Sequence, residues 1–426
     1  MRLLDRREAM RVSVASMAAL AAAPTACRRA RREDGRVVVG LWFSYGGTNR
    51  EVLLDLVGHF NRSQRDVRVR AVFQGDYFEA LAKLRTALAA GVAPAVSHVV
   101  GEVVPYLDAA HVLEPLDSYV GAAAIPFVRA LAQSGSYAGG DARPLVAIPF
   151  NRSTPVLYAN GALLDAAGVS IPQTWDSLRA AAIALTQREN GNVRWGFEVP
   201  ISWWFWVALV GQAGGTVVDR DGTATLGGDA GVRALRFWQQ LVHDDRVMRP
   251  PPGRDYNAWQ AANQDFLSQR TALVMTSSAF LRYLERNASF PVVAAPVPRD
   301  VRAAVPTGGT FWVMLRQAPR EEREAGWRFL RWMSESTQTA AWATRTGYLP
   351  VTTPAVQQLE TSGYYRSHRN DRVALDQLAD AMPWPWAPNL FRVQRNAVDP
   401  RLEEAVLTHR DARAVLAEAR AAAREA

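Results

Sequence analysis

Cysteine is almost absent from this sequence of 426 residues, since Cys27 is the only one. A single cysteine excludes an intramolecular disulfide, a thiolate metal cage and a Cys-X-X-Cys redox pair. The chain can fold without such cross-links, because its length and its 49% content of hydrophobic residues allow large buried cores. We therefore expect a globular protein of two or more lobes that holds no metal and no cofactor.

Lysine is equally scarce: Lys83 is the only one, so arginine carries nearly all of the positive charge. The formal net charge is +8, and the first 36 residues contribute +5 of it. The remaining +3 is spread along the chain without a basic helix or a stripe of interleaved basic and aromatic residues. Nucleic-acid binding requires positive charge gathered on one surface, so the sequence argues against a nucleic-acid partner.

Long apolar runs are also missing. The apolar run at residues 12–23 follows a basic start and is too short to span a bilayer stably, so we interpret residues 1–26 as an export signal. Arg6 and Arg7 resemble a twin-arginine export signal, but Ala9 stands where a more apolar residue is usual, so ordinary secretion is an equal alternative. No second apolar span follows, and we expect an exported protein that does not cross the membrane.

Cys27 follows three small residues, Pro24, Thr25 and Ala26, at the end of the apolar run. This arrangement resembles the cleavage and acylation site of bacterial lipoproteins, although Pro24 occupies the usual place of leucine. The alternatives are plain cleavage and an inert thiol. We expect a lipid anchor on Cys27, a charged spacer at residues 27–35, and a location in the periplasm or on the outer face of the cytoplasmic membrane.

Strands and helices alternate in the first part of the remaining chain. Residues 36–42, 67–73 and 96–100 are β-branched runs that predict strands, and helical spacing of leucines separates them at residues 51–60 and 77–90. This order is typical of a parallel sheet covered by helices on both faces.

A second α/β unit begins near residue 150, after the apolar run at residues 145–150. The pattern changes again at the glycine pair 308–309, and residues 401–426 predict one long amphipathic helix. The other predicted elements are strands at 156–158, 195–200 and 311–315 and helices at 161–167, 175–187, 203–212, 230–242, 320–334 and 337–344.

Four segments carry a resemblance to a known family: APAVSHVV at 93–100, IPFNRSTPVLYANGALLDAAGV at 148–169, PQTWDSLRAAA at 172–182 and TGYLPVT at 346–352. Together they resemble the extracellular solute-binding proteins of ABC-type importers, in the sugar-binding class. The closest branch is the one that binds glycerol 3-phosphate and related glycerophosphodiesters. The motifs occur in the family's order over essentially the whole mature chain.

The resemblance implies an α/β fold of two discontinuous lobes joined by a hinge, the type II-like periplasmic-binding-protein clamp. Residues 36–149 plus about 305–345 would form the first lobe, and residues 150–304 plus about 346–426 the second. The clamp would close on a small polar solute by population shift and release it to an ABC permease. We expect a monomer without catalytic activity.

The first lobe would contribute three cleft residues. Tyr77 matches a tyrosine that reaches the ligand in the family, and Tyr45 follows the first strand, where the carboxyl ends of parallel strands form a crevice. Glu102 follows the third strand, one place after the family's acidic position, which falls on Gly101 in an ungapped register. The alternatives are packing of Tyr77 against the sheet and a solvated loop carboxylate at Glu102.

The crossing between lobes would contribute further contacts. Ser153 matches a family serine that bonds the solute, and Arg152 replaces a small polar residue, as an extra anion contact or a surface charge. Ser277 and Ser278 open a helix after a strand, which predicts a phosphate cradle of hydroxyl and free N–H groups or an ordinary N-cap. Glycines close to the ligand would complete this region: Gly308 and Gly309.

Trp204 best matches a family tryptophan in the run Trp203–Trp206, whose other members are expected in the core. Tyr348 matches a cleft tyrosine. The family's phosphate-binding arginine would fall near residues 388–392, which makes Arg392 the candidate and Arg395 the second choice. The stretch with Trp384 and Trp386 could instead build a stacking surface for a neutral sugar.

Two other classes of function fit the sequence less well. A carbohydrate-active hydrolase needs two carboxylates about 5 to 10 Å apart, and Glu102 is the only one at a matched cleft position. A serine nucleophile lacks the G-x-S-x-G motif, and His98, beside Ser97, is the only histidine in a matched segment. The second alternative, a lipid-anchored scaffold without a ligand, would show no change in heat stability with any solute.

Overall fold

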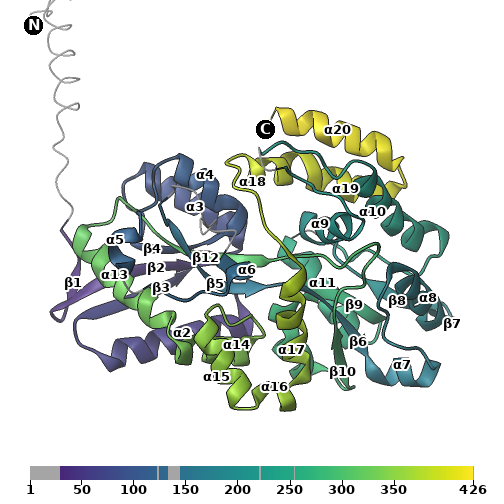
Figure 1. Cartoon of the computed structure of the whole chain (residues 1–426), viewed down its shortest axis with the longest axis horizontal. Coiled ribbons are helices and arrows are strands. Elements are labelled where there is room, and N and C mark those ends of the chain that lie inside the picture. Colours follow the sequence, from purple (N-terminus) through teal and green to yellow (C-terminus); the bar gives the residue numbers. More distant parts are fainter. Residues whose placement is uncertain (1–28, 122–123, 133–143, 220–221, 254, 426) are drawn as a thin grey trace, which may run out of the picture.

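Two β-sheets, each covered by helices, lie side by side in the computed structural model of the chain (Figure 1). The structure describes residues 29–121, 124–132, 144–219, 222–253 and 255–425. We call the part built on the six-stranded sheet the first lobe and the part built on the five-stranded sheet the second lobe. Cys27 and the export signal lie outside the described residues.

The first sheet contains the predicted parallel unit. Strand β2 (Arg36–Phe43) pairs in parallel with β3 (Val67–Phe73) and β4 (Val96–Val100). The connecting helices are α2 (Gly47–Ser63) and α3 (Tyr77–Ala89), whose buried leucines lie on one face each. Two strands from later in the chain, β12 (Gly308–Met314) and β5 (Ala147–Ser153), extend the sheet beyond β4, with β12 antiparallel to both β4 and β5. The short β1 (Arg32–Glu33), which precedes β2, pairs antiparallel with it.

The second sheet has β6 (Pro155–Asn160) and β9 (Thr271–Ser277) near its centre. Their side chains are buried throughout because helices cover both faces of the sheet. The outer strands are β10 (Val292–Ala295), β8 (Asn192–Glu198) and β7 (Gln187–Glu189), and the covering helices include α8 (Trp175–Leu185), α9 (Trp203–Gln212), α10 (Asp229–Gln239) and α11 (Asp255–Leu267).

The chain passes between the sheets at several points. Strand β5 ends at Ser153 and β6 begins at Pro155, so the first passage is a single residue, Thr154. The second precedes β12, where β11 (Val305–Pro306) pairs with β13 (Ala381–Met382). The third follows α14 (Ser336–Thr346), which packs on α2, and leads through α15 (Thr353–Thr361) and α16 (Tyr364–Ser367) to α17 (Arg369–Asp376), beside β10.

Helix α9 has no polar face. Its ten residues, Trp203–Gln212, are all buried, and the indoles of Trp203 and Trp206 are fully enclosed in the core of the second lobe. A helix that is apolar on every side is stable only when it is covered on every side. The expectation that most of this tryptophan run is core is confirmed.

The prediction of one long helix over residues 401–426 is wrong. Two helices cover this region, α19 (Asp399–Thr408) and α20 (Ala412–Arg424). His409 adopts a left-handed conformation with φ of 57°, and the Asp411 carboxylate accepts a hydrogen bond from the Ala414 N–H. The periodic apolar pattern therefore continues although α19 ends at His409 and a new helix begins with Asp411 as its N-cap.

The remaining elements connect these parts. They are the 3₁₀-helices η1 (Gly101–Val103), η4 (Ser278–Phe280) and η5 (Gln377–Asp380), the π-helical turns η3 (Gln240–Asp244) and η6 (Val393–Val398), and the helices α4 (Val104–Ala109), α5 (Asp117–Val120), α6 (Arg129–Ala132), α7 (Gly161–Ala167), α12 (Leu281–Asn287), α13 (Arg320–Met333) and α18 (Leu390–Arg392).

Candidate functional site

The carboxyl ends of β2, β3 and β4 point toward the passages between the lobes. Tyr45 follows β2, Tyr77 opens α3 after β3, and Glu102 lies in η1 directly after β4. Helix α3 begins at this edge because Asp76 forms a capping box with Glu79. Parallel strands thus bring three predicted cleft residues, which are distant in sequence, to one edge of the first sheet.

A group of phenols lies around Asn151, where β5 reaches the hinge. The hydroxyls of Tyr77 and Tyr348 interact with each other and with the Asn151 amide. Burial raises the pKa of Tyr77 to about 12, and the nearby Tyr348 hydroxyl and Asn151 side chain partly offset this increase. Tyr348 is 7% exposed and stacks on Trp342, with ring centroids 5.6 Å apart. Both phenols are therefore neutral hydrogen-bonding groups.

Tyr45 lies deeper in the same group. Its ring is 6% exposed and stacks on the His98 ring at 5.3 Å, and its hydroxyl has no hydrogen-bond partner among the described residues. Burial lowers the pKa of His98, whose imidazole is enclosed by aromatic rings, including that of Trp312 at 3.9 Å. His98 is thus a neutral core residue beneath the site.

The second lobe presents an aromatic wall. Trp204, at the start of α9, stacks on Trp259 of α11 with ring centroids 5.2 Å apart and planes 20° apart. Gly308 lies against the Trp204 indole, and a Cβ atom at this glycine would be 2.6 Å from its Cζ2 atom. The Trp204 Nε1 donor has no partner among the described residues. Only glycine at position 308 allows the hinge strand to approach this indole closely.

Arg152 is buried in the hinge, with 1% of its surface exposed. Its guanidinium donates from Nη1 to the Gly309 carbonyl at 3.0 Å and from Nη2 to Thr307 Oγ1 at 2.8 Å, and it covers the Phe311 ring at 4.4 Å. The interpretation of Arg152 as a surface charge is wrong, because strand β5 directs it inward. Burial lowers its pKa to about 10, and Glu102 opposes this decrease.

Glu102 is half-buried and interacts electrostatically with Arg152. Burial raises the pKa of its carboxyl, whereas the Arg152 charge lowers it. These two residues bring one negative and one positive charge to the same edge of the first sheet, so each partly neutralises the other.

The serines lie near the first passage between the sheets, Ser153 at the end of β5 and Ser277 and Ser278 where β9 leads into η4. Ser153 is buried opposite Gly308 in the strand pair, and Ser277 Oγ accepts a hydrogen bond from the Ala279 N–H at 3.2 Å, as an N-cap does. The Ser278 N–H donates to the Thr154 carbonyl at 3.0 Å. The N–H groups of Ser278 and Ala279 are therefore already bonded within the protein, and the expectation that free N–H groups form a phosphate cradle here is wrong for both.

One hydroxyl and one glycine of this region remain available to shape a cleft. Ser278 Oγ is buried without a partner among the described residues. Gly309 has a φ of +94°, and a Cβ atom there would overlap the Asn151 carbonyl oxygen. Its conformation and the close strand contact both require glycine.

The two candidate arginines near the C-terminus differ in their surroundings. Arg392 is exposed on α18. Arg395, in η6, lies over the Phe78 ring of α3 at 3.9 Å and forms a two-pronged ion pair with Asp255 of α11, at 2.6 and 3.1 Å. Of the two arginines, the one that contacts both lobes is therefore Arg395, the second choice for the phosphate-binding position.

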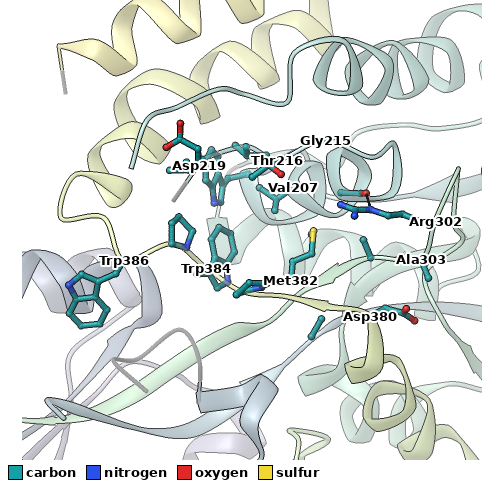
Figure 2. Close-up of a pocket in the computed structure, with 18 of the residues that line it drawn as sticks. Val207, Gly215, Thr216, Asp219, Arg302, Ala303, Asp380, Met382, Trp384 and Trp386 are labelled. Atoms are coloured by element: carbon teal, nitrogen blue, oxygen red, sulfur yellow. Dashed lines mark hydrogen bonds between the residues drawn. The ribbon is translucent and has the colours of Figure 1, made fainter. Parts of the chain in front are cut away.

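A cavity of about 720 Å³ is lined by Trp203 and Val207 of α9 and by the segment that contains Trp384 (Figure 2). Trp384 stacks on Trp203 at 6.1 Å and donates from Nε1 to the Thr307 carbonyl at 2.7 Å. Val207 and Met382 add apolar surface, and Arg302 lies at one end. The tryptophan stretch therefore builds a second aromatic surface, beside the start of α9.

Some residues around the hinge were missed by sequence reasoning. Asn151 directly precedes Arg152 in a matched segment, so the motif contained a signal for it. Trp259, Tyr256 and Phe280 contribute to the aromatic wall, but nothing in their local sequence separates them from core aromatics.

Neither a metal site nor a membrane span was found in the described ranges. Among those residues, no group of three or more His, Cys, Asp or Glu side chains could hold a metal ion. No helix in that part of the chain has the length and apolarity needed to cross a membrane.

Two α/β lobes with a polar and aromatic cluster at their crossing define the class of two-lobed solute-binding proteins. The family described as bacterial extracellular solute-binding protein matches residues 55–364. This chain belongs to that family and is a solute-binding protein for ABC importers. Its relatives are binding proteins of transporters.

The relatives include the sn-glycerol-3-phosphate-binding periplasmic proteins UgpB of Pectobacterium atrosepticum and Yersinia pseudotuberculosis. They are 25% and 26% identical over 387 and 386 residues, which is 86% of this chain and 85% and 86% of theirs.

Similar solved structures include UgpB from Mycobacterium tuberculosis in complex with glycerophosphocholine, with a TM-score of 0.80, 25% identity and coverage of 92% of this chain and 98% of that one. The GacH receptor of Streptomyces glaucescens has a TM-score of 0.80 and 20% identity, with coverage of 91% and 97%. Fold and family therefore agree with the predicted clamp.

Proposed function

We propose that this protein captures a small polyhydroxylated solute between its lobes, outside the cytoplasmic membrane, and delivers it to the membrane subunits of an ABC permease. The observation that supports this most is the convergence of Tyr77, Trp204 and Tyr348 from three distant segments and both lobes. Aromatic faces suit the C–H side of a polyol, and phenol and indole groups suit its hydroxyls.

A glycerophosphodiester or glycerol 3-phosphate is the first candidate. Relatives are named for glycerol 3-phosphate, and the similar M. tuberculosis structure holds glycerophosphocholine. The buried Arg152 charge and the Ser278 hydroxyl add groups that favour acceptor oxygens. The proposed contacts are Tyr45, Tyr77, Glu102, Ser153, Trp204, Ser277, Ser278, Gly308, Gly309, Tyr348 and Arg392.

A neutral sugar is the second candidate, and the pairing of Arg395 favours it. Its guanidinium already bonds the Asp255 carboxylate through two nitrogens, so this positive charge is compensated within the protein. Without an uncompensated arginine, a phosphate gains less from this part of the cleft, and stacking on tryptophan contributes more of the binding free energy.

We further propose that the protein catalyses no reaction on its solute. A hydrolase needs two carboxylates across one bond, and Glu102, the carboxylate among the proposed contacts, interacts with Arg152. Incubation of each solute with the protein, followed by chromatography, should return it unchanged. Appearance of a hydrolysis product above that of a Glu102→Gln control would refute this part of the proposal.

A thermal-shift screen tests the proposed function directly. The mature protein is heated with glycerophosphocholine, glycerol 3-phosphate or maltose, and we expect one of these solutes to raise Tm, because a ligand that binds only the folded state stabilises it. Titration calorimetry of the Arg392→Ala variant then separates the candidates. A phosphorylated solute should lose affinity in this variant and maltose should not. No change of Tm with any of the three would contradict the proposal.

The proposed anchor is tested independently of the cleft. If Cys27 is acylated, Cys27→Ser should move the protein from the membrane fraction to the soluble fraction and leave solute affinity unchanged, because the anchor and cleft are distant in sequence. Equal membrane retention of both forms would argue against lipidation.

A further inference from the structure

Two helix starts from different lobes lie near each other, at the place that we call the mouth of the proposed cleft. Helix α3 of the first lobe begins with Tyr77 and Phe78, and α11 of the second lobe begins with Asp255 and Tyr256. The phenols of Tyr77 and Tyr256 interact electrostatically, so the two helix starts are near each other. Arg395 of η6 lies between them.

Arg395 contacts both lobes at once. Its guanidinium carbon is 3.9 Å from the centroid of the Phe78 ring, a cation–π distance, while Nη1 and Nη2 bond the two Asp255 oxygens at 2.6 and 3.1 Å. Phe391, one turn earlier, also packs on Phe78, with ring centroids 5.7 Å apart. The first lobe is therefore held through an aromatic face and the second through an ion pair.

The same arginine is connected to the wall of the cleft. Its Nη1 is 3.6 Å from a carboxylate oxygen of Asp399, and the other Asp399 oxygen accepts a hydrogen bond of 2.8 Å from the Trp203 N–H. Asp399 thus caps α9 immediately before Trp204. Arg395 supports the wall without needing to touch the solute.

The charges around Arg395 argue against a role as the phosphate contact. Asp255 and Asp399 place two carboxylates within 4 Å of one guanidinium. A phosphate that approached it would have to displace or face these negative charges, which repel it.

We propose that Arg395 is an interlobe latch: it holds the closed form by joining Phe78 of the first lobe to Asp255 of the second, and it acts on solute binding as a positioning residue. This inference rests on the proposed function, because a latch matters only if the lobes open and close around a solute. The Phe78 contact would break on opening, whereas the Asp255 pair lies within the second lobe and would persist.

The test uses the mature protein, with Arg395→Ala compared with Arg372→Ala. Arg372 is a matched control, because it also bonds two carboxylates, Glu360 and Asp376, and lies 5.4 Å from the ring of Tyr365, but all these partners belong to α15–α17. Stopped-flow binding of glycerophosphocholine, glycerol 3-phosphate and maltose gives the association and dissociation rates, and small-angle scattering gives the radius of gyration.

Arg395→Ala should raise the dissociation rate of whichever solute binds by about tenfold, with little change in the association rate, because the latch forms after encounter. The effect should be the same for phosphorylated and neutral solutes. Phe78→Leu, which removes the ring but keeps an apolar side chain, should reproduce it, and it replaces Arg395→Ala if that variant misfolds. Arg372→Ala should bind as the wild type does.

If Arg395→Ala lost affinity for the phosphorylated solutes alone, the latch would be overturned in favour of a phosphate contact. Unchanged dissociation rates for all solutes would also overturn the latch. If the wild type binds none of the three solutes, the proposed function fails instead. Scattering then decides on the latch: ligand-free Arg395→Ala should have a larger radius of gyration than Arg372→Ala, and equal radii would refute it.

Discussion

The hinge side and the mouth of the cleft are each held by an arginine, but the two arginines sit in different environments. Arg282, on α12 behind the hinge, has 10% of its side chain exposed, whereas Arg395 at the mouth has 27%. Arg282 bonds only polar and charged groups, while Arg395 reaches the first lobe only through an aromatic face. The hydrogen bonds and ion pairs of Arg282 are directional and mostly buried. The contact between Arg395 and Phe78 can break without leaving a buried charge unpaired.

The contacts of Arg282 explain why the hinge side should stay closed. Its Nε donates to the Thr344 carbonyl of α14 at 2.9 Å and its Nη2 to the Tyr364 hydroxyl at 2.6 Å. It also pairs with Glu285 and with Asp371 of α17. Helix α12 is thus tied to the segment that leads into Gly347 and Tyr348. Opening is expected to leave this network intact and break the Phe78 contact.

The largest effect is expected at the hinge. Arg282→Leu should lower the free energy of unfolding by about 3 to 5 kcal/mol, because it leaves Asp371 partly buried without its charge partner. Urea unfolding measures this, with Arg286→Leu, an exposed arginine on the same helix, as the control. A loss below about 1 kcal/mol, within the range of surface ion pairs, would remove the distinction between hinge and mouth.

Glu198 lies near Asp265, at the opposite end of α11 from Asp255. Its titration therefore tests whether a charge at that end of α11 affects solute binding at the mouth. Glu198 is fully buried, and burial together with the Asp265 charge raises its pKa to about 9. A carboxyl whose pKa is higher in the folded chain binds its proton more tightly there. Its stabilising contribution is therefore complete below its ordinary pKa and is lost as the pH rises toward 9.

Glu198→Gln keeps the shape of the protonated acid but does not titrate. Between pH 6 and pH 8 the wild type should lose stability relative to this variant by up to about 1.4 kcal/mol per pH unit. Urea unfolding at both pH values measures the difference, and solute affinity at pH 7 should be unchanged. Parallel pH dependence of the two proteins would show that Glu198 is charged in the folded state.

The solute contacts on both sides can be compared in one titration. Trp204→Ala on the second-lobe wall and Tyr348→Ala on the hinge side should each weaken binding by roughly 1 to 3 kcal/mol, because each removes a large aromatic contact. Calorimetry with the best solute of the thermal-shift screen measures both. Wild-type affinity in both variants would mean that the cleft lies elsewhere.

Local sequence patterns predicted most elements well, because their limits are set by local chemistry. The strands at 67–73 and 96–100 and the helices at 161–167 and 203–212 have the predicted limits. The break at His409 was missed, since a single left-handed residue leaves the apolar period almost unchanged. Extended pairing also lengthened β5 beyond its apolar run, to include Asn151, Arg152 and Ser153.

The candidate site was less predictable because its key contacts join distant segments. The partners of Arg152, Thr307 and Gly309, are more than 150 residues away, so no local pattern distinguishes this buried arginine from a surface one. Likewise, Arg395 pairs with Asp255, 140 residues earlier. Tyr77 and Tyr348 could be selected by their motifs, but their shared contact with Asn151 emerged only from the fold.

We expect the lobes to close around a solute while the hinge stays intact. Small-angle scattering of the mature protein, with and without saturating concentrations of the solute that raises Tm, measures this closure. The radius of gyration should be smaller with the solute, and it should decrease less in Arg395→Ala than in Arg372→Ala. An unchanged radius of gyration in the wild type at saturation would contradict the clamp mechanism.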